Sequence, residues 1–369
     1  MVRYGQLLTT LLHPRSLSYC IFFVTARCNY RCKMCFYWNE IDDADLAKEL
    51  SLEEIQKIAE NMPHLFDLNL TGGEPFLRED LADVVRAFYE RSSLRFMTVP
   101  TNGSMPERIA DTVEKIRDSC PDLWLRITLS LDDIGEMHDE IRGVKGAFER
   151  TLETHDRLAE IVRRRTNLSL GMATVFSRYN QDRISEIYDF IESRLEVDNF
   201  GVLLARGDTR EEAATDVELE KYAGAVREAH ARLAGRRRGR SLYDRLFKAM
   251  GQSVGDLIIR TVLENRAVLP CVAGRRMVVV GPTGEVRPCE MLGPLIEHKG
   301  FPLDTDVMGN LRETEYDIRR ILTSERARHI VHTIRKQRCH CSFECAGTAN
   351  IAFNARAYPL LLRNLFRTL

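Results

Sequence analysis

Residues 19–35 read YCIFFVTARCNYRCKMC, and this stretch decides how the chain can fold. Tyr19–Thr25 is an apolar run rich in β-forming residues, which predicts a buried strand. Cys28, Cys32 and Cys35 follow directly, with the spacing Cys-x3-Cys-x2-Cys.

The three cysteines can hold three corners of an iron–sulfur cubane, which is usually bound by four cysteine thiolates. One iron would then stay open to a small molecule. The alternative is a structural zinc ion, which needs a fourth cysteine or histidine close by. The next residues are Phe36, Tyr37 and Trp38, none of which is a cysteine or histidine. The spacing therefore favours an iron–sulfur cluster, with zinc as the alternative.

Strand-like and helix-like segments alternate up to residue 233. Ser51, with Glu54 three positions later, predicts a capping box at the start of the first helix. Successive βα units imply a parallel sheet with helices outside and right-handed crossovers. Six units are too few for an eight-fold barrel, so we expect an open, partial (β/α)6 barrel with its chemistry at the carboxyl ends of the strands. The predicted strands are Tyr19–Thr25, Phe66–Leu70, Arg95–Val99, Trp124–Leu131, Leu168–Phe176 and Asn199–Ala205.

A second motif, Gly72, Gly73, Glu74 and Pro75, follows the second predicted strand. Two glycines let a backbone approach a ligand closely, and a carboxylate accepts hydrogen bonds from an ammonium group. The cysteine loop and this tetrapeptide, each placed after a strand, resemble the signature and GGEP motifs of the radical SAM superfamily. The resemblance implies an α/β partial barrel whose cluster binds S-adenosylmethionine (SAM), cleaves it and produces a 5′-deoxyadenosyl radical.

The resemblance also implies which residues serve the cofactors. Cys28, Cys32 and Cys35 would hold the catalytic [4Fe–4S] cluster. Asn102 lies in an Asn-Gly pair that is also an ordinary turn, and Arg206 is equally suited to a surface salt bridge. The residues expected to contact SAM are Met34, Gly72, Gly73, Glu74, Pro75, Asn102, Ser130, Asp132 and Arg206.

Residues 130–148 resemble a stretch found in the branch of this superfamily that carries a C-terminal SPASM or twitch extension. His138, Asp139 and Arg142 are the matching polar residues. Their alternative role is structural, in the loop and in helix capping.

A second cysteine group follows residue 269. Cys271 is followed by 12 residues, Gly284, four residues and Cys289, around a predicted hairpin of Met277–Val280 and Glu285–Arg287. This layout resembles the SPASM/twitch domain and implies an auxiliary [4Fe–4S] cluster. Five cysteines suffice for one four-cysteine cluster but not for two. Cys271, Cys289 and Cys345 are the firmest candidates, Cys341 or Cys339 would be the fourth, and a zinc ribbon is the alternative.

Composition and charge bound the remaining possibilities. Lys plus Arg is 53 and Asp plus Glu is 54, so the formal net charge of −1 does not favour a nucleic-acid partner. No apolar run reaches the ~18 residues of a membrane span, and no secretory signal is evident. We therefore expect a cytoplasmic protein, and we expect Cys20 and Cys120 to be buried apolar thiols.

The chain is expected to divide into five parts. The basic segment Gly235–Arg240 predicts a solvated turn, with contact to an anionic substrate as the alternative. Tyr358–Leu369 is amphipathic and predicts a docking helix, with contact to a membrane surface as the alternative. The parts are an N-terminal extension (1–18), a radical SAM partial barrel (19–210), a helical linker (211–268), an auxiliary-cluster domain (269–350) and a tail helix (351–369).

The function expected from the resemblance is that of a radical SAM oxidoreductase or maturase, supplied with electrons by a flavodoxin- or ferredoxin-type donor. Relatives with this extension mostly modify peptides, so peptide oxidation or crosslinking is expected first. The alternative is oxidation or epimerisation of a small metabolite, sugar or lipid. A second alternative is a non-catalytic iron–sulfur redox or sensor protein, which would have no use for a SAM pocket.

Overall fold

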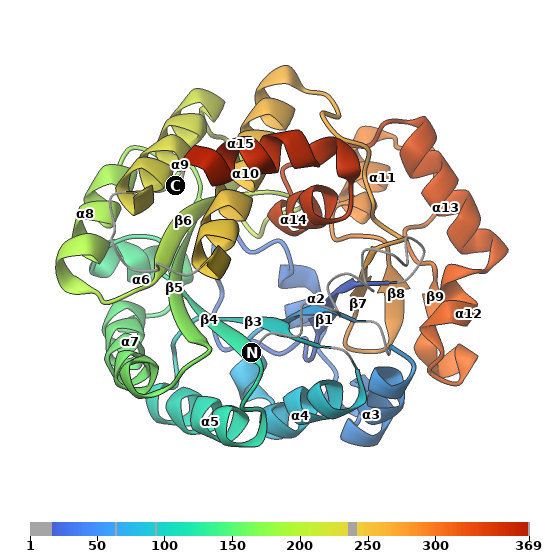
Figure 1. Ribbon diagram of the computed structural model, residues 1–369, viewed down its shortest axis with the longest axis horizontal. Coiled ribbons are helices and arrows are strands. Elements are labelled where there is room, and N and C mark those ends of the chain that lie inside the picture. The colour runs from blue at the N-terminus through green and yellow to red at the C-terminus, as the bar shows by residue number, and fades with distance from the viewer. Residues whose placement is uncertain (1–16, 63–64, 93, 235–241, 368–369) are drawn as a thin grey trace.

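The computed structural model describes residues 17–62, 65–92, 94–234 and 242–367 (Figure 1). Most of the expected N-terminal extension lies outside the described residues. The basic segment Gly235–Arg240 also lies outside them, so its predicted turn is not tested.

A nine-stranded sheet forms the frame of the protein, with the order β6-β5-β4-β3-β2-β1-β7-β8-β9. The pairs from β1 to β6 are all parallel and join strands that follow one another along the chain. The sheet curves without closing, which confirms the predicted partial barrel (Figure 1). The strands are β1 Tyr19–Phe23, β2 Asp67–Thr71, β3 Phe96–Thr101, β4 Trp124–Ser130, β5 Leu168–Phe176, β6 Asn199–Leu204, β7 Met277–Val280, β8 Glu285–Arg287 and β9 Gly309–Asn310.

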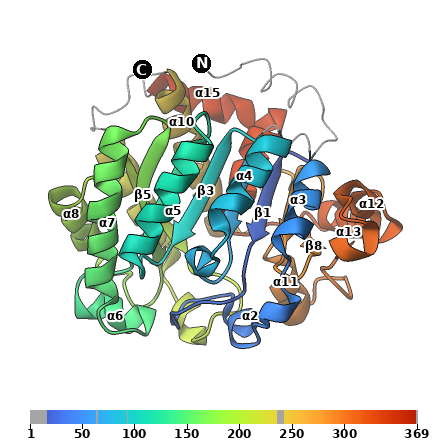
Figure 2. The same ribbon diagram turned by 90° about the horizontal axis from the view of Figure 1, so that it is seen from below.

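Helices cover the outer face of this sheet (Figures 1 and 2). The helices are α2 Trp38–Asp42, α3 Leu52–Glu60, α4 Leu81–Arg91, α5 Pro106–Ser119, α6 Glu136–Arg142, α7 Ala147–Arg164, α8 Ile184–Arg194, α9 Leu219–Ala234, α10 Leu242–Glu264, α11 Leu292–Lys299, α12 Ile318–Leu322, α13 Glu325–Lys336, α14 Glu344–Ala352 and α15 Tyr358–Arg367.

Burial along the strands shows which side chains join the apolar core and which face the interior of the barrel. In β2, β3, β4 and β6 fully buried residues alternate with half-buried ones. The buried set, such as Leu68 and Leu70 of β2, joins the apolar core together with Val84 and Phe88 of α4. The half-buried set includes Asp67 and Asn69. Because side chains alternate between faces of a strand, the second set faces the interior of the barrel.

The hairpin predicted near residue 280 is present with the predicted bounds. Its first strand, β7, pairs in parallel with β1, from Tyr19 opposite Met277 to Phe22 opposite Val280. The C-terminal region therefore extends the barrel sheet and does not build a sheet of its own. The sequence did not show this, because a pairing between segments so far apart leaves no local pattern.

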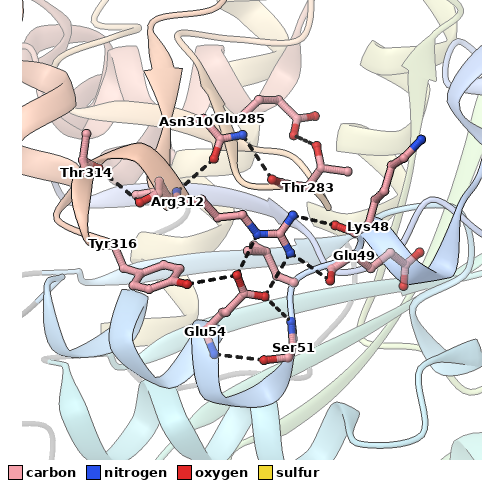
Figure 3. Close-up of polar contacts among 12 residues, drawn as sticks. Lys48, Glu49, Ser51, Glu54, Thr283, Glu285, Asn310, Arg312, Thr314 and Tyr316 are labelled. Carbon is pink, nitrogen blue, oxygen red and sulfur yellow. Dashed lines mark hydrogen bonds and ion pairs between the residues drawn. The ribbon is translucent and has the colours of Figure 1, made fainter.

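The start of α3 joins the C-terminal region to the barrel (Figure 3). Ser51 and Glu54 form the predicted capping box, with Ser51 N donating to Glu54 at 2.8 Å and Glu54 N donating to Ser51 Oγ at 3.3 Å. Arg312 also donates to both Glu54 oxygens, at 2.7 and 3.0 Å, and to the carbonyl of Lys48 at 2.9 Å. Tyr316 adds a fourth contact to Glu54. One carboxylate thus caps a barrel helix and anchors the distant segment.

The tail helix α15 lies across α10 (Figure 1). Asn364 Nδ2 donates to Ser253 Oγ at 3.1 Å, and Arg363 pairs with Asp256 at 2.8 Å. Leu362 and Phe366 remain exposed on its other face. Within the described part of the chain, no helix has the length and apolarity to cross a membrane.

Candidate active site

The first cysteine loop lies between β1 and α2, at the end of the barrel where the parallel strands finish. Figure 2 shows α2 and α6 together at this end, opposite α10 and α15. Backbone hydrogen bonds hold the loop on two sides. Arg31 N and Lys33 N donate to the carbonyls of Arg142 and Ile141, and Arg210 N donates to the carbonyl of Cys35 at 3.0 Å. The loop is therefore fixed by the segments that follow β4 and β6.

The three thiols of this loop lie close enough to influence one another. Burial raises the pKa of Cys28 to about 12, and the charges of Glu74 and Cys32 add to the rise. Burial also raises the pKa of Cys35 to about 12, with Cys32 as the next cause. Thiolates are the form that binds metal, and a bound cation reverses such shifts. The loop therefore fits an iron–sulfur cluster, which would supply the missing positive charge.

Hydrogen-bond donors surround these sulfurs. Tyr30 N donates to Cys28 Sγ at 3.4 Å, and Asn102 Nδ2 approaches the same sulfur at 3.9 Å. Arg142 Nη1 donates to Cys32 Sγ at 3.7 Å. Donors to cysteine sulfur help to set the reduction potential of a cluster. Their presence supports the fit between the loop and a redox-active cluster.

Arg142 is held in place by Asp132, at a distance of 2.6 Å between Nη2 and Oδ2. Asp132 is completely buried, and its Oδ1 also accepts from Val175 N at 2.8 Å. In the structure, Asp132 is therefore the partner that orients Arg142. Its predicted contact with SAM stays a prediction.

The other two polar residues of the 130–148 stretch have structural partners, as the alternative for that stretch supposed. His138 Nδ1 accepts from Asp132 N at 3.1 Å, inside the protein. Asp139 accepts from Gly146 N and Phe148 N at the start of α7. The sequence grouped the three residues together. In the structure, Arg142 is the one of the three that contacts a cysteine of the first loop.

The two glycines of the GGEP motif serve a close approach within the chain itself. A Cβ on Gly72 would lie 2.2 Å from Thr25 O, and a Cβ on Gly73 would lie 2.1 Å from Arg27 O. Gly73 N donates to Thr25 O at 3.0 Å. The absence of side chains therefore lets the end of β2 pack against the segment that leads into the cysteine loop.

Glu74 is buried and already has protein donors. Its oxygens accept from Thr101 Oγ1 at 2.8 Å, from Asn102 N at 2.7 Å and from Phe76 N at 3.2 Å. Burial raises its pKa to about 7. Pro75 follows as the first residue of a short 3-10 helix. Glu74 ties β3 to the GGEP turn, and its predicted contact with the SAM ammonium stays a prediction.

The remaining residues expected to contact SAM fall into two groups. Asn102 directly follows β3 and Ser130 ends β4, at the same edge of the sheet, and Asn102 Nδ2 also donates to Asn29 Oδ1 at 2.9 Å. Met34 is buried in a small apolar cluster with Ile141, Ala205 and Ala214.

Arg206 is not a surface residue, because its side chain is 12% exposed. It pairs with Glu344 at 2.9 Å and with Glu290 at 3.5 Å. Its guanidinium carbon lies 4.7 Å from the ring centre of Phe343 and 5.4 Å from that of Phe36. Phe36 follows Cys35, whereas Glu290 follows Cys289. Arg206 therefore joins the two cysteine regions, a role that sequence spacing did not reveal.

Four of the later cysteines share one cavity. Cys271, Cys289, Cys339 and Cys341 line it, together with apolar residues of α10 and α14 such as Ile258. Burial, and then the neighbouring Cys341, Cys271 and Cys339, raise the pKa of Cys289 well above its usual value. Four mutually close thiols fit one auxiliary cluster.

Cys345 lies outside the lining of that cavity. Its sulfur accepts from Asn69 Nδ2 at 3.6 Å, on the barrel side of α14. Burial and then Glu290 raise its pKa to about 12. Sequence layout made Cys345 one of the firmest ligands and left Cys339 and Cys341 as alternatives. The geometry instead groups Cys339 and Cys341 with Cys271 and Cys289.

The two cysteines outside both groups are buried thiols. Cys20 and Cys120 are fully buried, as predicted. In the described ranges, no three histidine, cysteine, aspartate or glutamate side chains converge closely enough to hold a single metal ion.

Comparisons with known proteins agree with this geometry. Residues 22–191 match the family described as the radical SAM superfamily, and residues 271–346 match the SPASM iron–sulfur cluster-binding domain. These domains imply a SAM-binding [4Fe–4S] cluster, an auxiliary iron–sulfur cluster and SAM as cofactors.

Two curated relatives differ in what they are named for. A probable GTP 3′,8-cyclase of Archaeoglobus fulgidus is 26% identical over 85% of this chain and 93% of its own length. The subtilosin biosynthesis protein AlbA of Bacillus subtilis is 24% identical over 91% of this chain and 68% of its own.

Two solved structures share the fold. Streptococcus suis SuiB bound to its precursor peptide SuiA has a TM-score of 0.55 and 15% identity, covering 90% of this chain and 70% of SuiB. The enzyme anSMEcpe with bound AdoMet and a peptide has a TM-score of 0.54 and 16% identity, covering 95% of this chain and 99% of that chain.

Proposed function

The chain belongs to the radical SAM superfamily and carries a C-terminal SPASM domain, and on that premise we propose that it oxidises or crosslinks a peptide. The observation that carries the proposal is that one barrel holds two separate groups of cysteines. Arg206 connects them through its contacts with Glu290 and Phe36. The relative AlbA acts in bacteriocin biosynthesis, and two proteins of the same fold, SuiB and anSMEcpe, bind peptides.

In this proposal Cys28, Cys32 and Cys35 hold the catalytic cluster. When bound, the reduced cluster and SAM would supply radical chemistry able to abstract hydrogen from a substrate. Arg142 holds the sulfur of Cys32 by a hydrogen bond, and Asp132 fixes the orientation of Arg142. The turn at residues 72–75 braces the loop from the β2 side through its backbone hydrogen bonds.

Cys271, Cys289, Cys339 and Cys341 hold the auxiliary cluster in the same proposal. Arg206 keeps the two regions in a fixed relation, because it is paired with Glu290 next to Cys289 and stacked near Phe36 next to Cys35. A flavodoxin- or ferredoxin-type protein is proposed as the electron donor.

A second candidate is oxidation or rearrangement of a small metabolite. It is favoured by the match to a probable GTP 3′,8-cyclase over 93% of that protein. The same barrel edge and auxiliary cavity serve either reaction, so substrate trials must separate them.

The test begins with anaerobic reconstitution. We expect about eight irons in the wild-type protein, about four in a C28A/C32A/C35A variant, and 5′-deoxyadenosine only from the wild type, since each cubane holds about four irons. Zinc in place of iron, or iron with no SAM cleavage, would contradict the radical enzyme and favour a metal-stabilised binding or sensor protein.

Substrate class is tested next, with peptides encoded beside the gene and with GTP as the metabolite probe. A peptide that loses two hydrogens in step with 5′-deoxyadenosine formation supports the proposal. Coupled conversion of GTP without any peptide would overturn it in favour of the second candidate.

A further inference from the structure

A cavity of about 250 Å³ opens between α13 and the loop that follows Cys271. Arg275, Arg328, His332 and Arg335 line it, and no lining residue is acidic. Arg328, His332 and Arg335 follow one another at helical spacing on α13. Residues three and four apart share a helix face, so one face of this helix presents its cationic groups to the cavity.

These arginines differ from their neighbours in having no carboxylate partner. Nearby, Arg319 pairs with Asp317 at 3.0 Å and Arg320 pairs with Glu315 at 3.1 Å. Among the described residues, Arg275, Arg328 and Arg335 form no ion pair within 4.0 Å. Like charges gathered around a concavity repel one another, and an anion bound there would offset the repulsion.

The cavity is built into the fold. Gly274 has a φ of +74°, and a Cβ on it would lie 2.7 Å from Val331 of α13. A glycine here lets the loop and the helix approach closely enough to form the cavity walls. Arg275 Nη2 also lies 3.5 Å from the carbonyl oxygen of Cys271, beside the auxiliary cavity.

We propose that this cavity, lined by Arg275, Arg328, His332 and Arg335, binds a phosphate-bearing anion beside the auxiliary-cluster region. Guanidinium groups donate paired hydrogen bonds to phosphate oxygens. A phosphoryl or pyrophosphoryl group carries two or more charges in a small volume, which suits three arginines around a cavity of this size. A liquid water molecule occupies about 30 Å³, so the space holds a group of several non-hydrogen atoms.

The proposal is independent of the reaction proposed above, because binding is measured without SAM cleavage. The probe is inorganic pyrophosphate, titrated into the reconstituted protein by calorimetry at fixed ionic strength. We expect saturable binding and a rise in melting temperature, since a ligand that binds only the folded state stabilises it. An R275Q/R335Q variant should bind at least tenfold more weakly and lose the rise in melting temperature.

The matched control is R319Q/R320Q, which removes the same charge from α12, outside the cavity lining. It should bind pyrophosphate within twofold of the wild type. Equal weakening in both variants would overturn the site in favour of diffuse electrostatic attraction, and so would the absence of saturable binding. Citrate binding as tightly as pyrophosphate would overturn the phosphate assignment and indicate docking of a carboxylate-rich chain. Unchanged iron content and circular dichroism in both variants show that the comparison concerns folded protein.

Discussion

The two thiol groups of this protein lie in opposite surroundings. The loop of Cys28, Cys32 and Cys35 is braced by polar groups from several segments, with Arg142 and Asn102 beside its sulfurs. The cavity of Cys271, Cys289, Cys339 and Cys341 is lined mainly by apolar side chains, some of them from α10 and α14. Polarity and hydrogen bonding around a cluster set its potential and access to solvent. The difference suits a reactive first site and a protected second one.

The largest expected effect tests which cysteines define the second site. C339S should lower the iron content from about eight to about four atoms, because its thiol lines the shared cavity. C345S should keep about eight, because its sulfur faces Asn69. Iron counting and Mössbauer spectra of the two variants provide the comparison. Loss of four irons in C345S, with none lost in C339S, would restore Cys345 as a ligand.

The next effect concerns the brace of the first site. G73A should lower the free energy of unfolding by about 3 kcal/mol, since its Cβ would lie 2.1 Å from Arg27 O and force the backbone apart. G201A in β6 is the matched control, because a Cβ there meets nothing within 4 Å. Urea unfolding of both reconstituted variants tests this. Equal stability of the two would mean that the GGEP turn does not constrain the loop.

A smaller effect tests the polar character of the first site. R142K should slow 5′-deoxyadenosine formation by tenfold or more without loss of iron, since lysine cannot hold both Asp132 and Cys32. Loss of the donor to sulfur should also make the midpoint potential of the first cluster more negative, as measured by EPR-monitored titration. R157K, a change on the exposed face of α7, is the control. An unshifted potential in R142K would show that Arg142 serves packing alone.

The smallest effect concerns Glu54, where the C-terminal region meets the barrel. E54Q should lower the free energy of unfolding by about 1 kcal/mol at pH 7, since it weakens the contacts to Arg312 and Tyr316. Arg312 holds the pKa of Glu54 at about 2, below its usual 4.5. The stabilisation is therefore complete above about pH 4.5 and is lost as the pH falls toward 2.

Urea unfolding at a series of pH values checks this sign. The difference between wild type and E54Q should shrink only below about pH 4.5. E60Q, which changes a more exposed pair with Arg91 on the same helix, is the control. A difference that grows on acidification would contradict the assigned direction.

Local patterns in the sequence were enough to predict the barrel. The alternation of strands and helices predicted β1 to β6, and the Ser51–Glu54 spacing predicted the capping box that the structure shows. Cysteine spacing identified both metal-binding regions. These features depend on neighbours along the chain, so they leave a signal in a single sequence.

Contacts between distant segments could not be predicted from the sequence alone. The pairing of β7 with β1, the place of Arg206 between Glu290 and Glu344, and the separation of Cys345 from the other four thiols all depend on tertiary packing. The GGEP glycines show the same limit, since their nearest neighbours are backbone atoms of Thr25 and Arg27. The sequence by itself determined the fold class and the cysteine groups, because periodicity and spacing are local. Only the tertiary structure decided which groups meet, because that depends on how the sheet curves.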